Sequence, residues 1–401
     1  MWWGLTVSLV GDGIFFVALP LQVLDLRNDP TALTIVLVAW TLPMVAFLMI
    51  GGVLSDRLER RKILILAVTL QGLAVGLIGV LGVAGELEIW HLLVLAAIYG
   101  VGEAMFGPAF GSIVPDLVPT ELLVQANALD NLSRPLALRV AGPALGGIII
   151  ATIGLGNAFL LDAGTFVVGM IAFLLIAKRP AAATSAGAFI WTEIKVGLSY
   201  VRAHSWLWGG FVSIAVGLLV FYGPWQTLVP YVVINKLNGN ESDLAMIFSV
   251  GGVGAVISSL IIGQRSLPKQ YLTAMYLAFG VGTLMLTGFG LATETWHAAA
   301  ASFMMQALLT AGIITWATTL HRMVPGEVLG RVSGLDWMVS TSLIPVSLAV
   351  AGPLSKAIGP DNLLVGAGLV GCAAVLSFLS LPGIRAPERT SHPAEVASEP
   401  L

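Results

Sequence analysis

The sequence predicts an all-α membrane protein with twelve transmembrane helices in two pseudo-symmetric six-helix bundles. Three observations support this fold class. Of the 401 residues, 57% are hydrophobic and only 10% are charged, whereas about 25% of the residues of a soluble protein are charged. Glycine, proline and charged clusters divide the chain into twelve long apolar segments, and the two halves of the chain share a short repeated pattern. A bilayer is therefore the expected solvent.

Each apolar segment is long enough to cross a hydrocarbon layer of about 30 Å as a helix. The first span lacks a basic flank and a small-residue cleavage site, so it is not expected to be a signal peptide. The spans of the first half are expected at 2–24, 31–54, 63–84, 91–114, 123–150 and 155–177. Those of the second half are expected at 207–234, 243–263, 271–291, 297–320, 328–353 and 360–381.

The distribution of Lys and Arg predicts the orientation. Twelve spans place both termini on one side. If alternate span ends are assigned to the cytoplasm, starting at the N-terminus, sixteen of the nineteen Lys and Arg residues lie there, and Arg27, Lys236 and Lys356 lie opposite. Because cytoplasmic loops are enriched in Lys and Arg, we expect both termini in the cytoplasm of a multi-pass protein of the cell inner (plasma) membrane.

The polar stretch Lys178–Ser205 divides the chain nearly in half. Residues 191–202 alternate apolar and charged positions at helical spacing, which predicts an interfacial amphipathic helix. The expected organisation is an N-terminal bundle at 1–177, a cytoplasmic central loop at 178–206, a C-terminal bundle at 207–381 and a disordered cytoplasmic tail at 382–401.

The halves repeat in register. Val118–Leu123 aligns with Val324–Leu329 at an offset of 206 residues, and Ala141-Gly142-Pro143 recurs as Ala351-Gly352-Pro353 with a further shift of four. Two six-helix halves related in this way are expected when a binding site lies between them near the middle of the membrane.

Several function classes are disfavoured. The single cysteine, Cys372, excludes a disulfide within the chain and any zinc cluster, and no cofactor or metal is expected. No Walker-type G-x-x-x-x-G-K-[ST] motif is present, which disfavours an ATP-driven pump unless a separate subunit supplies the ATPase. No nucleophile, acid pair or histidine group has a catalytic spacing, so neither an enzyme nor a nucleic-acid-binding protein is expected.

A dense charged turn, Gly51–Lys62, joins the second and third spans. Its pattern G-x-L-S-D-R-x-x-R-R resembles the loop between helices two and three in the major facilitator superfamily of secondary transporters. Glu59 replaces the second glycine of the family pattern. The matching residues are Gly52, Leu54, Ser55, Asp56, Arg57, Arg60 and Arg61.

The resemblance covers essentially the whole chain and implies the major facilitator fold. It also implies that the turn faces the start of helix eleven, near 327–331. Gly52, Asp56, Arg57, Arg60 and Arg61 would then form a gating loop that contacts the other half only when the cytoplasmic side is closed. The alternative is that the basic residues serve topology alone.

A glycine-proline motif, Arg139-Val-Ala-Gly142-Pro143-Ala-Leu-Gly146-Gly147, lies in the fifth span. Small residues let helices approach closely, and proline kinks a helix. The motif resembles the antiporter signature of drug:proton exchangers, although Leu138 stands where that signature has a further glycine. Close packing without antiport is the alternative.

Other runs resemble, within the superfamily, the exporter branch that includes macrolide efflux and enterobactin export proteins. They include Ser8–Gly13, Phe106–Ala109 and Ala158–Ala163.

Acidic residues inside the spans need an explanation, because an ionised side chain at a helix centre costs about 2.5–3.5 kcal/mol. Asp12 and Glu103 fall near mid-span, in helices that the resemblance places around a central cavity. Burial disfavours the charged form of a carboxylate, so each could bind a proton from one side and release it to the other. The alternative is a structural hydrogen bond. Asp130 and Arg134 are expected to pair, and Asp162 to be a packing or capping acid.

The resemblance also places helices seven and ten beside the cavity. Aromatic and Met side chains there suit bulky lipophilic molecules, although contact with lipid or other helices is the alternative. The candidate substrate residues are Tyr222, Trp225, Gln226, Met305 and Trp316.

The sequence therefore predicts a secondary active transporter. We expect proton-coupled efflux of amphipathic small molecules, drug-like or siderophore-like, by alternating access. The expected partners are the small-molecule substrate, protons and the lipid bilayer, and a monomer is the expected functional unit. The alternatives are a proton-coupled importer or facilitator of a small metabolite and, third, a non-transporting membrane receptor.

Overall fold

The computed structural model describes residues 2–118, 133–176, 190–265 and 267–389, together with Leu122 and Asp130. Within these ranges the regular structure is entirely helical. Twelve helical segments are long and apolar enough to cross a membrane, which confirms the predicted all-α, twelve-helix fold class.

Six spans precede and six follow the amphipathic helix α8 (Ile190–Ala203). The first half contains α1 (Trp2–Leu26), α2 (Pro30–Arg57), α3 (Arg60–Ala84), α4 (Ile89–Leu117), the π-helix η2 (Leu136–Ala141), α6 (Gly142–Ile153) and α7 (Leu155–Leu174). The second half contains α9 (Ser205–Asn235), α10 (Glu241–Gly263), α11 (Tyr271–Leu284), α12 (Leu286–Gly290), α13 (Thr295–Met323), α14 (Gly326–Ser342), α15 (Ile344–Ile358) and α16 (Pro360–Ser377). The short helices η3 (Phe378–Ser380) and α17 (Ala386–Arg389) follow α16.

Some spans are less regular than predicted. The ninth span divides into α11 and α12, and the eleventh divides into α14 and α15. The fifth span combines a π-helical turn with α6, and the predicted residues 123–129 at its start lie outside the described residues.

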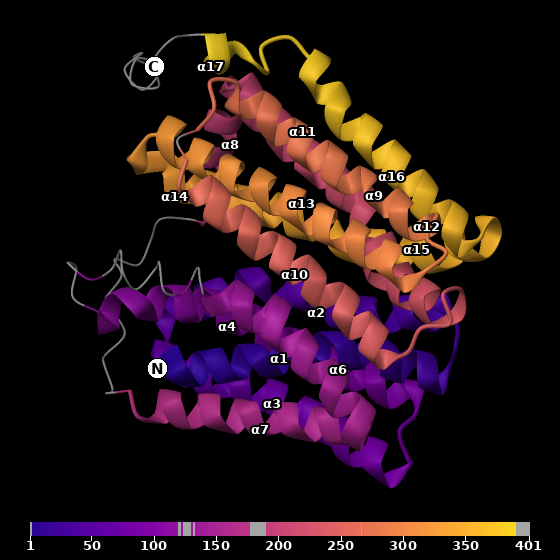
Figure 1. Cartoon of the computed structure of the whole chain (residues 1–401). Helices are drawn as coiled ribbons and strands as arrows, with labels where there is room; N and C mark the ends of the chain where they lie inside the picture. The colour runs from indigo at the N-terminus through magenta and orange to yellow at the C-terminus, as the bar shows by residue number, and fades with distance from the viewer. Residues whose placement is uncertain are drawn as a thin grey trace.

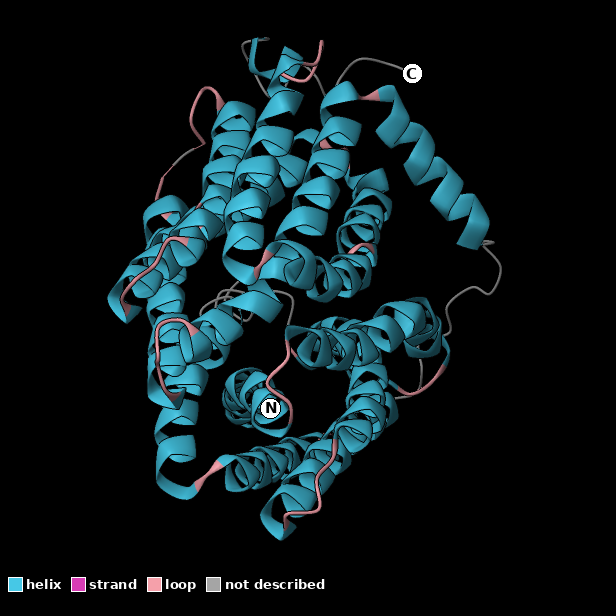
Figure 2. Cartoon of the chain, turned by 90° about the vertical axis from the view of Figure 1, so that its right-hand side faces the viewer, coloured by secondary structure: helices cyan, strands magenta, loops and turns pink. Residues whose placement is uncertain are grey.

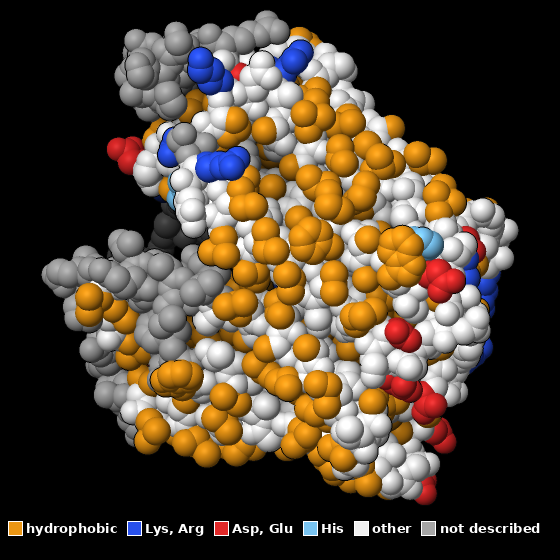
Figure 3. Space-filling model, viewed as in Figure 1, with side chains coloured by type: hydrophobic (Ala, Val, Ile, Leu, Met, Phe, Trp, Pro, Cys, Tyr) orange, Lys and Arg blue, Asp and Glu red, His pale blue; other side chains and the backbone are white. Residues whose placement is uncertain are grey.

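The halves form two groups of helices, and α17 lies toward the end of the molecule at which α1 begins (Figure 1). Figure 2 views the molecule from the opposite end. We call the end where α1 and α3 begin and α13 finishes the termini side, and the opposite end the distal side. Hydrophobic side chains cover the flank between them, whereas charged side chains gather toward the two ends (Figure 3). This is the surface expected of a multi-pass membrane protein.

The two glycine-proline helices, α6 and α15, join the halves. Helix α6 packs on α1 of its own half and on α10 of the other half, while α15 packs on α9 of its own half and on α2 of the other. Contact is close because a Cβ atom at Gly142 would clash with Gly13 of α1, and one at Gly352 would clash with Thr34 of α2. The repeated Gly-Pro sequence therefore marks equivalent positions in the two halves.

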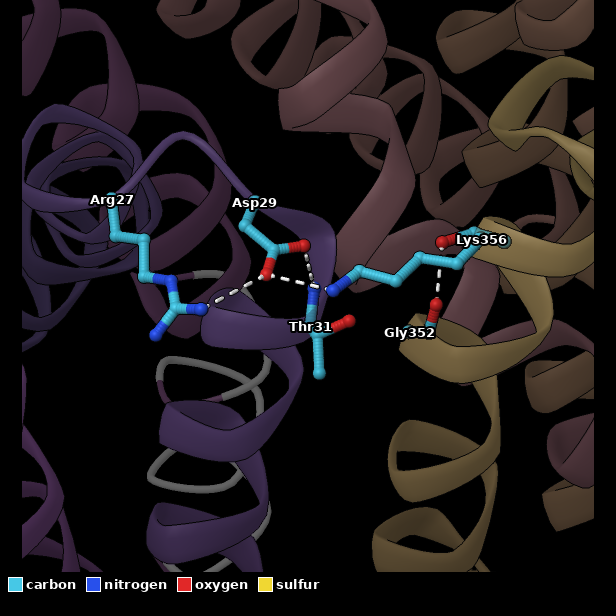
Figure 4. A network of polar contacts seen from close by, with 6 residues as sticks. Arg27, Asp29, Thr31, Gly352 and Lys356 are labelled. Atoms are coloured by element: carbon cyan, nitrogen blue, oxygen red, sulfur yellow. Dashed lines mark hydrogen bonds and ion pairs between the residues drawn. The ribbon is translucent and has the colours of Figure 1, made fainter.

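Polar contacts join the halves on the distal side. The Asn28 and Asn235 side-chain amides bond to each other at 2.6 and 3.0 Å, and Lys356 Nζ lies 3.0 Å from the Asp29 carboxylate (Figure 4). The described conformation therefore has its halves fastened together on the distal side.

Candidate transport site

Two membrane-embedded acids lie on one network inside the first half. The Tyr99 hydroxyl of α4 donates to the Asp12 carboxylate of α1 at 2.8 Å. One turn further along α4, the Glu103 carboxylate accepts from the Trp40 indole N–H of α2 at 2.7 Å. Both acids are half-buried, so neither is sealed inside the bundle. The network links α1, α2 and α4 through two carboxylates and their hydrogen-bond donors.

Aromatic rings hold these donors in place. Phe15 stacks on Tyr99 with ring centroids 4.6 Å apart, and it meets Trp40 edge-to-face at 5.7 Å. Trp40 and Tyr99 also meet edge-to-face at 5.7 Å. Such pairs prefer these offset and perpendicular geometries. The packing therefore fixes the directions in which the indole N–H and the phenol O–H point at the two carboxylates.

Asp162 on α7 is a third acid in the same half. It is fully buried, and Thr165 Oγ1 lies 3.2 Å from its Oδ1. Its Oδ2 has no hydrogen-bond partner among the described residues. A Cβ atom at Gly11 would clash with Asp162 Oδ1, so Asp162 packs against the residue that precedes Asp12.

The ion pairs found among the described residues involve other acids than Asp12, Glu103 and Asp162. Arg134 nevertheless lies within electrostatic range of Asp12. The predicted pair of Asp130 and Arg134 is confirmed, with 3.4 Å between Arg134 Nε and Asp130 Oδ2. Two half-buried acids and one buried acid that lack a direct ion pair are costly when ionised in a membrane-embedded bundle.

An aromatic cluster centred on Trp225 connects the halves beside this network. Its ring lies 6.0 Å from Phe16 of α1 and 6.5 Å from Phe248 of α10. Tyr222 meets Trp225 edge-to-face at 5.8 Å. Two of the predicted substrate residues, Tyr222 and Trp225, are therefore partly buried in the central region.

Three predicted substrate residues are buried instead. Gln226 is 4% exposed and Met305 is 0% exposed. Trp316 packs against Trp206 and donates its indole N–H to Asp336 at 3.1 Å. In this conformation these side chains contact neighbouring helices, which is the alternative that the sequence left open.

The fifth span has a structural cause for its irregularity. Pro143 has no N–H to donate to the Arg139 carbonyl, four residues earlier, and the preceding residues form a π-helix instead. Gly252 of α10 lies directly against that carbonyl. Gly146 packs on Ile14 of α1. The small residues thus allow close packing on both sides of α6, and any antiport role of the motif stays a prediction.

The predicted gating loop is only partly described. The backbone of α2 reaches Arg57 and includes Gly52, and the side chains of Asp56 and Arg57 are outside what the structure describes. Arg60 begins α3. Arg61 donates to the carbonyl oxygens of Phe173 and Leu174 at 3.0 and 2.6 Å, so it caps the end of α7 in its own half.

Tyr99 and Trp40, which are the hydrogen-bond partners of the two acids, are not among the residues predicted from the sequence. Tyr99 was detectable, because it precedes Glu103 by four residues and so shares its helix face. Trp40 was not, since it lies 63 residues away from Glu103. For Asp162 the sequence predicts a packing or capping acid, and it gives no sign of the contact with Gly11.

Comparison with known proteins identifies the family. The Major Facilitator Superfamily profile matches residues 1–347. The chain belongs to the Major Facilitator Superfamily. It is therefore a transporter rather than an enzyme, as the sequence predicted.

Its relatives within the superfamily include transporters and exporters. The uncharacterized MFS-type transporter YfiS of Bacillus subtilis (strain 168) is 27% identical, covering 94% of this chain and 89% of the relative. Macrolide efflux protein A of Streptococcus pyogenes is 23% identical, covering 94% of both chains. Enterobactin exporter EntS of Citrobacter koseri is 27% identical, covering 93% of this chain and 89% of the relative.

Solved structures of this superfamily share the fold. A bacterial homologue of the iron transporter ferroportin, crystallised in an inward-facing state, superposes with a TM-score of 0.72 at 17% identity. The match covers 94% of this chain and 97% of that one. At this identity the likeness shows the fold alone.

Proposed function

We propose that this protein exports bulky, amphipathic small molecules in exchange for protons, by alternating access. The network of Asp12 and Glu103 with their hydrogen-bond donors, beside the buried Asp162, carries the proposal. Asp12 and Glu103 would take up and release protons as the halves move. Their hydrogen-bond donors, Tyr99 and Trp40, favour the ionised form, while burial favours the protonated form, so both states are accessible.

The aromatic cluster supports the proposed class of cargo. Tyr222, Trp225, Phe16 and Phe248 present apolar faces from both halves. Relatives named for macrolide efflux and for enterobactin export support outward transport of bulky molecules. Substrate would displace water from these rings, which provides a driving force that does not depend on its shape in detail.

In this proposal the moving bodies are the bundles at 1–177 and 207–381, joined by the loop at 178–206, in a monomer of the inner membrane. The termini side would face the cytoplasm, where cations gather by the positive-inside rule. The described conformation would then accept substrate from inside. The loop with Asp56, Arg57, Arg60 and Arg61 would close that side after protons leave.

The test uses inside-out membrane vesicles with an imposed pH gradient. Wild-type protein should accumulate fluorescent lipophilic dyes from a panel, and a protonophore should abolish the accumulation. Addition of a transported dye should also move protons across the membrane. Glu103→Gln keeps the size of the side chain but cannot titrate, so it should lose pH-driven accumulation while still binding the dye.

Glu86→Gln is the matched control, because Glu86 is an exposed acid in the distal loop between α3 and α4. It should accumulate dye as the wild type does. Retained pH-driven accumulation by Glu103→Gln at equal membrane abundance would remove Glu103 from the mechanism. Movement of the dye only down its own concentration gradient would favour a facilitator.

A further inference from the structure

Arg139 is a charged residue of the central region that proton exchange does not require. It lies on the π-helix η2, one turn before Pro143, and its side chain is exposed. Within the described ranges, no acid or hydrogen-bond acceptor pairs with its guanidinium group. In this it differs from Arg134, which pairs with Asp130.

The surroundings of Arg139 place it between the halves rather than against lipid. Its carbonyl lies against Gly252 of α10, and the hydroxyl of Ser249 donates to the next carbonyl, that of Val140, at 3.4 Å. The Tyr222 hydroxyl of α9 lies within electrostatic range of both Arg139 and Glu103. The guanidinium therefore shares the central region with the aromatic cluster and the acid network.

A guanidinium that has no partner among the described residues of a membrane protein is costly unless something binds it. Its planar group offers five N–H donors in a geometry that matches carboxylate and phosphate oxygens. A π-helical turn is a frequent feature of functional sites, because it redirects side chains and frees backbone groups. Its exposure leaves these donors available to a ligand.

We propose that Arg139 binds an anionic group of the transported molecule. The substrates would then be bulky organic anions, with the charged oxygen atoms on Arg139 and the apolar part against Tyr222 and Trp225. This inference rests on the proposed transport function, because it names the class of cargo. The binding test below does not depend on proton coupling.

The experiment compares 1-pyrenebutyrate with its methyl ester, which differ in one charge and share the apolar body. Binding to purified protein is followed by energy transfer from tryptophan to pyrene. Wild-type protein should bind the acid at least tenfold more tightly than the ester. Arg139→Gln should weaken binding of the acid by about 10- to 100-fold, the range for hydrogen bonds to charged groups, and leave the ester unchanged. Arg139→Lys should retain part of the preference.

Arg322→Gln is the matched control, since Arg322 is an exposed arginine in the last turn of α13. It should keep the preference for the acid. Equal binding of acid and ester by wild-type protein would overturn the proposal, even if Arg139→Gln does not fold. Equal weakening of both compounds by Arg139→Gln would also overturn it, because it would indicate a structural or counter-ion role.

The outcome separates this inference from the proposed function. Selective binding of 1-pyrenebutyrate without pH-driven accumulation would support the anion-binding role of Arg139 and reject proton exchange. Accumulation of neutral or cationic dyes by a protein that does not prefer the acid would reject the anion site and leave the exchange standing.

Discussion

The absence of a Cβ atom at Gly252 lets the two halves approach closely at this position. A Cβ atom there would clash with the carbonyl of Arg139 and crowd Val140. The carbonyl is backbone, so it cannot move aside as a flexible side chain would. The Arg139 region therefore keeps its position only while position 252 remains glycine.

We expect Gly252→Ala to lower the free energy of unfolding by about 1–3 kcal/mol, the usual cost of overpacking. Thermal unfolding of the purified protein measures it. Gly164→Ala on α7 is the control, because its Cβ would meet nothing within 4 Å. It should be neutral or stabilising by up to about 1 kcal/mol. Equal unfolding temperatures for both variants would contradict the tight contact.

Helix α11 begins with a cap supplied from far along the chain. Its N-cap residue, Gln270, makes no side-chain capping bond. Instead Glu388 of α17 accepts from the Thr273 backbone N–H at 2.7 Å and from the Thr273 hydroxyl at 2.9 Å. Ile384, in the segment leading to α17, is fully buried. The segment after α16 thus anchors the start of the ninth span, so residues 382–389 are ordered, contrary to the disordered tail predicted from the sequence.

Glu388→Ala should therefore loosen the first turn of α11. Loss of a cap costs about 0.5–2 kcal/mol, so amide hydrogen exchange across residues 271–275 should accelerate about 2- to 30-fold. Mass spectrometry of the corresponding peptide measures the rate. Glu86→Ala removes an exposed carboxylate from a loop and should leave this peptide unchanged. The capping role would be wrong if both variants exchanged alike.

At the scale of elements, the sequence predicts helices better than it predicts which way they face. Hydropathy predicts the positions of all twelve spans in the sequence because each needs about 20 apolar residues. It does not predict how each helix is rotated about its own axis, since a helix that is apolar all round has no distinctive face. Met305 and Trp316 are therefore buried in this conformation, although the resemblance placed their helix at the cavity. Pro143 was visible in the sequence, but the π-helical turn before it depends on packing against α1 and α10.

For the molecule as a whole, the distal contact between Asp29 and Lys356 biases the position of the halves. Asp29 lies outside the membrane spans. Its partial burial raises the pKa of the carboxyl, but the Thr31 amide, Lys356 and Arg27 outweigh that effect and hold the pKa below its ordinary value (Figure 4). Opening the distal side removes Lys356, so the open form binds a proton more readily than the closed form.

The sign of the pH dependence follows. At pH values above the ordinary carboxyl pKa of about 3.9, the ion pair of Asp29 with Lys356 stabilises the closed distal side. This stabilisation is lost as the pH falls through the lowered pKa that Asp29 has in the closed form. At neutral pH, Asp29→Asn should increase the ratio of distal-open to closed molecules by about 1.5- to 5-fold, the range for surface ion pairs, because the Lys356 side chain is 55% exposed. It should also remove this acid-induced opening.

Spin labels introduced by Glu86→Cys and Glu294→Cys, in a Cys372→Ser background, report this ratio as a distance distribution across the distal side. Glu86 and Glu294 are exposed and lie in distal loops of different halves. Asp25→Asn is the matched control, because Asp25 is an exposed acid near the same end of α1. If Asp29→Asn leaves the distribution unchanged at neutral pH, the Asn28–Asn235 contact and the packing of α15 on α2 hold the distal side closed without the ion pair.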